Sequence, residues 1–224
     1  MLRCDQIRRR FQGPGGALTA LEDVTFAADR GELVVIQGPS GSGKTTLLLT
    51  LGGLLRPDAG TMQVDDQDLY ALSTAARSRF RARTIGFVFQ LFHLVPYLSV
   101  LDNVLAGLPG SVDGAARRRT AALLEELGLT ARLAHRPATL SAGERQRTAL
   151  ARALVKEPAV ILADEPTGNL DPENAALVFR RLDAFRREGG VVVAVTHGQD
   201  AAPHATRTLR LERGRLAGSL PLSR

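Results

Sequence analysis

Cysteine, lysine and long apolar runs are scarce or absent in this chain of 224 residues. The single cysteine, Cys4, excludes an internal disulfide framework and a metal cluster built from cysteines. No apolar run approaches the roughly 18 residues that a membrane-spanning helix needs. The charged start, residues 1–5, is not followed by a hydrophobic stretch, so we expect no secretory signal. These absences favour a cytosolic protein, and an apolar fraction of 44% is ample for a packed core.

Lysine occurs only at Lys44 and Lys156, although the chain has 29 basic residues and a formal net charge of +6. The other 27 are arginines in scattered groups such as Arg8-Arg9-Arg10. That ratio is more typical of a genome-wide preference for arginine than of a phosphate-binding face. We therefore interpret the arginines as solvated helix faces and turns and expect no nucleic acid partner. A basic surface facing anionic lipid remains an alternative.

The most informative motif is a glycine-rich stretch that fits the pattern G-x-x-x-x-G-K-[ST] at residues 38–45. It lies between apolar runs at 33–36 and 46–51, which predict a buried strand and the start of a helix. In this context glycines let backbone amides wrap around phosphate oxygens at the positive end of a helix. Lys44 is then expected to reach the terminal phosphates, and the Thr45 hydroxyl is expected to hold magnesium.

Other apolar runs predict a parallel sheet that is covered on both faces. The runs at 84–89, 159–163 and 191–195 indicate buried strands, with a helix expected over 175–187. The first 30 residues indicate a hairpin that turns at Gly13-Pro14-Gly15-Gly16.

The middle of the chain has a different character. Residues 61–70 indicate a short strand and turn, whereas residues 91–150 contain no clear strand. A helical pattern over 115–127 is expected to end at Gly128.

These elements predict an α/β fold, a P-loop NTPase (RecA-like) core with a parallel sheet. An N-terminal antiparallel β lobe and an inserted helical subdomain complete it. We expect one domain over residues 1–224, in which the core and β lobe span about 1–90 and 155–224. The helical subdomain is expected over about 91–154.

Two adjacent carboxylates, Asp164 and Glu165, follow the predicted strand at 159–163. In a P-loop protein the first acid can complete a magnesium shell with Thr45, and the second can polarise a water for attack on the γ-phosphate. The bound cation would offset the repulsion between the two acids. A capping or surface role for Glu165 is the alternative.

Gln90 and His197 also follow predicted strands. The amide of Gln90 could sense the metal or the attacking water, although a lone glutamine after a strand is most often a turn residue. His197 lies at the sheet edge where α/β proteins bind ligands, and it could donate to the γ-phosphate.

A second anion site is predicted where Ser141, followed by the small residues Ala142 and Gly143, opens a long helix. One chain would then offer two half-sites for phosphate. Taken by itself, an ordinary capped helix explains this segment better.

Together these segments resemble the ATP-binding subunits of ATP-binding-cassette (ABC) transporters from about Phe11 to Gly214, nearly the whole chain. The motifs that agree in order and spacing are the phosphate loop at 38–45, the glutamine loop at Gln90, the signature at 140–144, Asp164 with Glu165, the loop at 168–171 and the switch histidine His197. Residues 84–90 and 94–104 are similar to the lipoprotein-release, macrolide-efflux and cell-division branch.

The resemblance implies that ATP is held between two copies of the chain stacked head to tail, so that hydrolysis to ADP and phosphate requires a homodimer. It implies catalytic roles for Glu165, His197 and Gln90, and Mg²⁺ held by Thr45, Gln90 and Asp164. The adenine is expected to stack on Phe11, where the family often has tyrosine. The residues expected to bind ATP are Phe11, Gly38, Pro39, Ser40, Gly41, Ser42, Gly43, Lys44, Thr45, Thr46, Ser141, Gly143, Glu144 and Asp171.

Three residues depart from the family pattern. Ala142 replaces a more usual glycine, and we expect binding to survive the added methyl. Glu144 replaces a common glutamine and brings a carboxylate near the nucleotide. Gly198 occupies a position where an aspartate often follows the histidine, which puts the backbone support of His197 in question.

A membrane permease is the other partner that the resemblance implies. The apolar strip at 91–98 is expected to form a groove for a permease helix, and a satellite core under the insertion is an equal alternative. The chain would then be peripheral on the inner face of the cell membrane.

We expect an ATPase that powers a membrane transporter. A non-transport ATPase that regulates a cell-envelope or division complex shares all of this chemistry, and the sequence does not separate the two. A nucleic-acid or translation ATPase of the same superfamily usually needs two cassettes or a long coiled-coil insertion, and neither is present.

Overall fold

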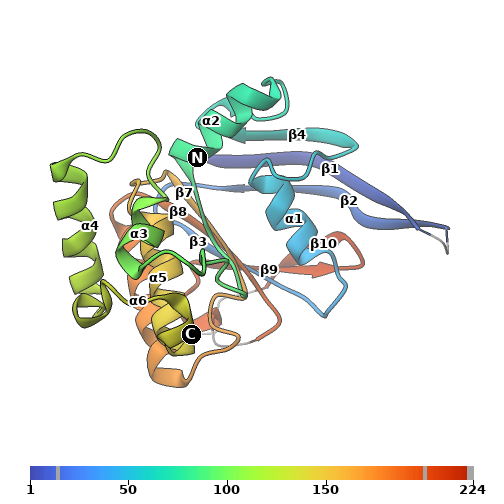
Figure 1. Ribbon diagram of the computed structural model, residues 1–224. Coiled ribbons are helices and arrows are strands. Elements are labelled where there is room, and N and C mark those ends of the chain that lie inside the picture. The colour runs from blue at the N-terminus through green and yellow to red at the C-terminus, as the bar shows by residue number, and fades with distance from the viewer. Residues whose placement is uncertain (14–15, 199–200, 221–224) are drawn as a thin grey trace.

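The larger of two sheets has six strands in the order β10-β9-β3-β8-β7-β6 (Figure 1). The structure is a computed structural model that describes residues 1–13, 16–198 and 201–220. Neighbouring strands are parallel except β10, which is antiparallel to β9. The strands are β3 (Leu33–Gln37), β6 (Ile85–Val88), β7 (Val160–Asp164), β8 (Val191–Thr196), β9 (Arg207–Glu212) and β10 (Arg215–Leu220). The predicted parallel sheet is confirmed.

The smaller sheet has four strands in the order β2-β1-β4-β5, all antiparallel. Its strands are β1 (Leu2–Gly13), β2 (Gly16–Ala28), β4 (Ala59–Val64) and β5 (Gln67–Asp68). This sheet is the predicted N-terminal β lobe. Two residues of the predicted hairpin turn, Pro14 and Gly15, lie outside the described residues.

Both faces of the parallel sheet are buried, because alternate side chains of each strand enter different cores. In β3, Val34 and Ile36 join the core shared with the smaller sheet and with α1 (Lys44–Leu51). Leu33 and Val35 join a second core on the other face. The helices that contribute to the second core are α3 (Val100–Leu105), α4 (Gly114–Glu126), α5 (Ala142–Leu154) and α6 (Pro172–Arg187).

These helices begin at side chains that accept a backbone N–H, as helix N-caps do. Ser99 caps α3, Asp113 caps α4, Ser141 caps α5 and Asp171 caps α6. As predicted, Gly128 follows the end of α4, in a left-handed conformation with φ 66°. Short 3-10 helices occupy Thr130–Arg132, Pro137–Thr139 and Ala202–His204.

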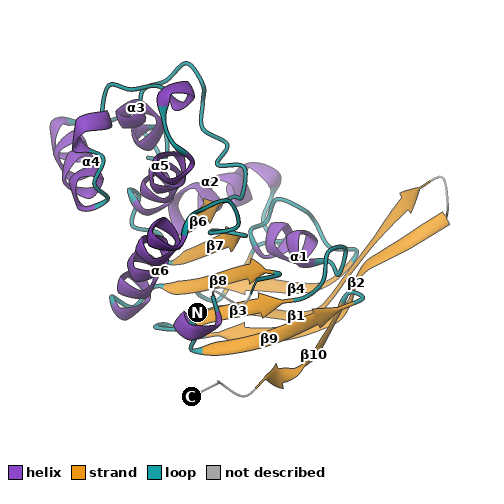
Figure 2. Ribbon diagram, turned by 90° about the horizontal axis from the view of Figure 1, so that it is seen from below, coloured by secondary structure: helices purple, strands orange, loops and turns teal. Residues whose placement is uncertain are grey.

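The positions of the helices and of the carboxyl ends of the parallel strands show where a ligand site can lie. Helices α3, α4 and α5 gather on the left in Figure 1, away from the long hairpin of β1 and β2. The arrowheads of β7 and β8 in Figure 2 point toward the side on which α1 lies. Ligands of open α/β sheets bind at this carboxyl edge. Within the described ranges, no helix is long and apolar enough to cross a bilayer.

Some elements are not anticipated by the sequence analysis. The helix α2 (Thr74–Thr84) has no buried residue, so it has no apolar period to reveal it, and Ser73 caps its start. Strands β9 and β10 extend the parallel sheet beyond β3. The subdomain limits at 91 and 154 stay a prediction.

Candidate active site

The glycine-rich loop connects β3 to α1, as predicted. Gly41 and Gly43 have φ of 77° and 103°, a left-handed backbone that favours glycine. A Cβ at Gly38 would overlap the carbonyl oxygen of Leu211. Lys44 is buried, and its ammonium donates to the carbonyl oxygens of Gly38 at 2.7 Å and Pro39 at 3.0 Å. The loop therefore holds a cation at the N-terminus of a helix, which suits phosphate.

A hollow of about 440 Å³ opens beside this loop. It brings together residues from six separate segments of the chain. Its lining includes the predicted Phe11, Ser40, Gly41, Gly43, Lys44, Thr45, Thr46, Gln90, Asp164, Glu165 and His197, and also Leu18, Thr19 and Ala20 of β2, which the sequence analysis does not single out. The guanidinium of Arg9 lies over the ring of Phe11, with its Cζ 4.9 Å from the ring centroid.

A magnesium site fits one corner of this hollow. The Thr45 hydroxyl donates to Asp164 Oδ2 at 3.0 Å, and Gln90 lines the same space. Burial raises the pKa of Asp164, and the hydrogen bond from Thr45 partly offsets that effect. Hydroxyl, carboxylate and amide oxygens are hard ligands of the kind Mg²⁺ prefers. Among the described residues, no three His, Cys, Asp or Glu side chains form a metal cluster.

The Glu165 carboxylate is held by the end of strand β8. Its Oε2 accepts a hydrogen bond from the Thr196 hydroxyl at 2.8 Å, and its Oε1 accepts one from the His197 backbone N–H at 2.9 Å. His197 Nδ1 lies 2.7 Å from Oε1. Because an ionised carboxylate only accepts, this contact requires a proton on Nδ1. The side chain of Glu165 is only 11% exposed, so it is not a surface acid.

The backbone of Glu165 is also unusual. Its φ is 45°, a left-handed value that is uncommon for a residue with a side chain. Its N–H donates to Val195 O at 2.9 Å, so the β7–β8 ladder continues through the bend. Such outliers persist where surrounding structure fixes them and are often found at functional sites.

The contacts of Gly198 answer the question raised by the missing aspartate. The Gly198 N–H donates to Thr196 Oγ1 at 3.0 Å, and its carbonyl accepts from Gln37 Nε2 at 3.1 Å. The turn after His197 is therefore held by a buried threonine and a glutamine of β3. The sequence analysis does not single out Thr196, although it directly precedes His197.

The second predicted anion site lies at the start of α5, and its residues do not line the hollow. Ser141 and Glu144 form a capping box: Ser141 Oγ accepts from the Glu144 N–H at 3.2 Å, and Glu144 Oε2 accepts from the Ser141 N–H at 2.7 Å. Arg132 Nε donates to Glu144 Oε1 at 2.7 Å.

Close packing ties this half-site to the start of α6. A Cβ added at Gly143 would lie 2.5 Å from Asn174 Cγ, so an alanine there would force the Asn174 side chain to shift. Asn174 also accepts from Arg147 and donates to Asp171 Oδ2 at 2.6 Å. Asp171 caps α6, and these hydrogen bonds lower its pKa. Asp171 is thus outside the hollow and next to the second half-site.

A different hollow, of about 330 Å³, lies between β6, the end of α3 and the end of α5. Phe87 and Phe89 line it and stack on each other at 5.3 Å. Arg152 and Lys156 are its only charged lining residues among those described. Burial lowers the pKa of Lys156 to about 8, with a smaller contribution from Arg81.

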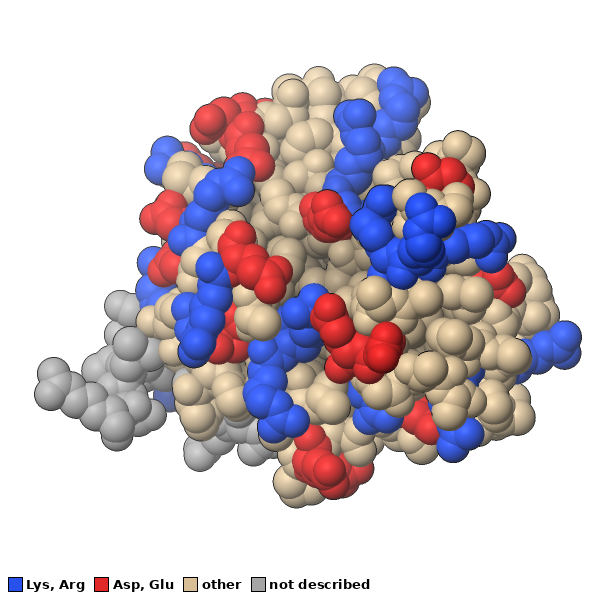
Figure 3. Space-filling view, turned by 90° about the vertical axis from the view of Figure 1, so that its left-hand side faces the viewer, with Lys and Arg blue, Asp and Glu red and all other residues tan. Residues whose placement is uncertain are grey.

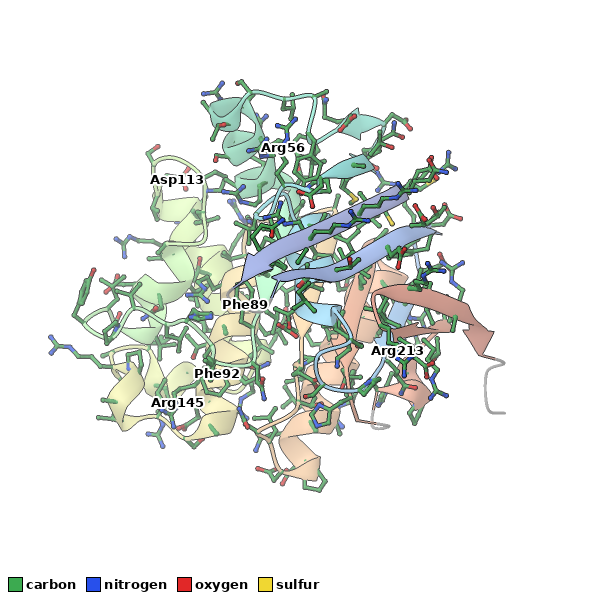
Figure 4. The ribbon with its side chains drawn as sticks, turned by 90° about the vertical axis from the view of Figure 1, so that its right-hand side faces the viewer. Arg56, Phe89, Phe92, Asp113, Arg145 and Arg213 are labelled. Carbon is green, nitrogen blue, oxygen red and sulfur yellow. The ribbon has the colours of Figure 1, made fainter. Side chains whose placement is uncertain are left out.

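The strip at 91–98 is partly buried and partly exposed. None of its residues belongs to either buried cluster, and Leu91 and Tyr97 are 72% and 73% exposed. Figure 4 shows Phe92 beside Arg145 of α5, whose guanidinium carbon lies 5.8 Å from the ring centroid. Phe92, Leu94, Val95 and Leu98 are partly buried, so the permease groove and the satellite core both stay predictions.

Acidic and basic side chains are both distributed over the helical face shown in Figure 3. Arg181 of α6 pairs with Glu126 of α4 at 3.2 Å, beside a hollow of about 610 Å³. Asp183 pairs with both Arg186 and Arg187. The side chains of Arg181, Arg186 and Asp183 are 27%, 21% and 19% exposed, so these ion pairs are partly buried and differ from the solvated helix faces expected from the sequence.

Comparisons with known proteins match this geometry. The sequence model of the ABC transporter family matches residues 21–168. The chain is 41% identical over 219 residues to the lipoprotein-releasing system ATP-binding protein LolD of Idiomarina loihiensis, with 96% of this chain and 95% of that protein covered. It is 44% identical over 215 residues to LolD 2 of Caulobacter vibrioides, with 94% and 93% covered. A solved dimer of the ATP-binding cassette MJ0796, in a post-hydrolysis state bound to ADP and Pi, has a TM-score of 0.91, 33% identity and full coverage of both chains.

Proposed function

We propose that this chain, which belongs to the ABC transporter family and is an ATP-hydrolysing subunit of a membrane ABC system, powers the release of lipoproteins from a membrane. One observation carries the choice of substrate: relatives named for lipoprotein release are similar to it over nearly its whole length. The chain would work on the inner face of that membrane, bound to permease subunits.

The division of the site between two copies is the geometric basis of the mechanism. The phosphate loop and the acids share one hollow, whereas Ser141 and Gly143 lie outside it. We infer that ATP in the hollow of one chain is covered by the helix start of its partner, as in the head-to-tail homodimer. Ser141 is suited to this role because its oxygen already accepts from the Glu144 N–H, which leaves its hydroxyl proton to donate outward.

Within the hollow, each predicted residue has a task that its position permits. Lys44 and the backbone amides of the loop would bind the phosphates, and the Phe11 ring would stack on adenine. Bound Mg²⁺, held by Thr45, Asp164 and Gln90, would neutralise charge that develops on the phosphates. Glu165 would accept a proton from the attacking water, and His197 would orient it.

Glu165 in its present hydrogen bonds faces β8, with both oxygens engaged. We infer that one of these contacts loosens when the nucleotide and the partner copy complete the site. The base is thereby kept in position before ATP arrives and becomes active only in the dimer.

The hollow beside Phe87 and Phe89 is our candidate for the permease contact. Its wall includes Phe89, the residue before Gln90, and the charged side chains among its described lining residues are the two cations Arg152 and Lys156. A permease helix that presents a carboxylate between apolar residues would fit this lining best, because burying the Lys156 ammonium without a partner is costly. A change at Gln90 would then reach the permease through β6.

The test is reconstitution of the chain with its permease subunits in vesicles that contain a lipid-anchored protein. We expect ATP to release that protein, and Glu165→Gln to abolish release while it traps an ATP-bound dimer detectable by size-exclusion chromatography. ATP hydrolysis without release of any lipoprotein would reject the substrate assignment and favour a regulatory ATPase. Undiminished hydrolysis by Glu165→Gln would remove Glu165 from its role.

A further inference from the structure

The start of α5 carries a fixed negative charge at the place where a phosphate is expected. Glu144 occupies the third position of the helix, within the capping box with Ser141. The hydrogen bond from Arg132, together with that from the Ser141 N–H, lowers the pKa of Glu144 to about 2. The carboxylate is therefore ionised at neutral pH.

Such a charge conflicts with anion binding. A helix N-terminus attracts phosphate through its unpaired N–H groups and its positive dipole end, and a carboxylate there competes for the same donors. It would also repel the γ-phosphate of an ATP molecule bound to the partner copy. A glutamine at this position would be neutral. A helix that starts with Glu144 therefore needs a compensating positive charge, whereas one with glutamine there would not.

Arg132 supplies that charge from outside the helix. It ends the 3-10 helix Thr130–Arg132, and its Nε donates to Glu144 Oε1 at 2.7 Å. Its side chain is 42% exposed, whereas that of Glu144 is 17% exposed. Within the described part of the chain, only Nε of this guanidinium has a hydrogen-bond partner. The two terminal nitrogens thus remain available as donors next to the half-site.

We propose that Arg132 is a positioning residue of the half-site that each chain offers to its partner's ATP. It neutralises Glu144 and fixes the carboxylate against the Ser141 N–H, so that the Ser141 hydroxyl can face a phosphate without a bare negative charge beside it. This inference rests on the proposed composite site and adds the requirement that Arg132 and Glu144 act as a unit.

A double-mutant cycle separates this role from a structural one. Arg132→Ala, Glu144→Gln and the double variant are compared by steady-state ATP hydrolysis, with KM and kcat determined separately. We expect Arg132→Ala to raise KM for ATP about fivefold when Glu144 is present, since an uncompensated charge then faces the phosphate. In the Glu144→Gln background the same change should alter KM less than twofold. The effect on kcat at saturating ATP should be small in both backgrounds.

The matched control is Arg136→Ala, because Arg136 is an exposed arginine four residues away and has no ion pair among the described residues. It removes the same charge without touching Glu144, and KM should stay within twofold of the parent value. Arg132→Lys should restore part of the loss, since it returns the charge without the planar donor group.

A second measurement does not depend on turnover. In the Glu165→Gln background, the ATP concentration at half-maximal dimer formation should rise with Arg132→Ala and fall back when Glu144→Gln is added. Equal effects of Arg132→Ala in both Glu144 and Glu144→Gln chains, or no effect in either, would overturn the role of Arg132. Failure of the composite site itself would appear differently, as an ATP-bound Glu165→Gln chain that stays monomeric before Arg132 is changed.

Discussion

Replacing Thr196 by valine tests how strongly stability and ATP hydrolysis depend on the hydrogen bond from Thr196 of β8 to Glu165. Valine has nearly the same shape, but it lacks the hydroxyl that donates to Glu165 Oε2 at 2.8 Å and accepts from the Gly198 N–H at 3.0 Å. Thr196 is 6% exposed, so water cannot readily replace both bonds. A hydrogen bond to a charged acceptor contributes about 1.5–3 kcal/mol, and the Gly198 N–H would lose its partner as well.

The expected loss of stability is therefore about 2 kcal/mol, or a fall in melting temperature of roughly 4–8 °C for a chain of this size. Because Glu165 is then held by His197 alone, kcat should fall about tenfold while KM for ATP changes little. Thr196→Ser is the matched control, since it keeps the hydroxyl and loses only a methyl group. Differential scanning fluorimetry and steady-state hydrolysis measure both quantities. Equal kcat in Thr196→Val and the parent, or equal losses in the serine and valine variants, would refute the role assigned to the hydroxyl.

Three further predictions concern the half-site and the groove. Gly143→Ala should destabilise the chain by about 1–3 kcal/mol, because the added methyl overlaps Asn174. Combining it with Asn174→Ala should recover part of the lost melting temperature. An unchanged melting temperature in the single variant would show that the Asn174 side chain moves aside at no cost. Lys156→Met should raise the melting temperature at pH 7 by about 2–4 °C, because burial lowers the pKa of Lys156 to about 8 and the folded chain therefore binds this proton less tightly than the unfolded chain. The gain in melting temperature should shrink as pH rises from 8 to 10.5, the ordinary pKa of lysine. A gain that does not change with pH would contradict this effect of burial. Glu144→Gln should be less stable than the parent at pH 7 by up to about 1 kcal/mol in urea titrations. Because folding lowers the pKa of Glu144 from 4.5 to about 2, this difference in the free energy of unfolding should narrow as pH falls from 4.5 to 2. A difference that widens in acid would show that the ion pair with Arg132 does not stabilise the fold.

The phosphate loop and the buried strands were predictable because their signals are local. Residues 33–36 are continuously apolar, and the structure buries them on both faces of a parallel sheet. Gln90, Asp164 and His197 follow strands of the parallel sheet and line one hollow, since strand ends meet at one sheet edge, whereas Phe11 reaches that hollow from β1 of the smaller sheet.

Other features depend on contacts that a single sequence does not reveal. The helix α2 has no fully buried residue and packs on the core through the partly buried Phe80, so it lacks the apolar period by which helices are recognised. Arg132 is 12 positions from Glu144 and pairs with it only because the intervening turns bring them together. The close packing at Gly143 comes from Asn174, 31 residues further along the chain.

The central claim is that each ATP is bound by two copies of the chain, and complementation between inactive variants tests it most directly. Lys44→Ala disables the phosphate loop of a chain, and Ser141→Arg disables the half-site that the chain offers to its partner. Each variant alone should be inactive. A mixture should regain hydrolysis, because a heterodimer contains one site that combines an intact phosphate loop with an intact Ser141. Full activity of either variant alone, or a mixture that stays inactive although heterodimers form, would contradict the shared site.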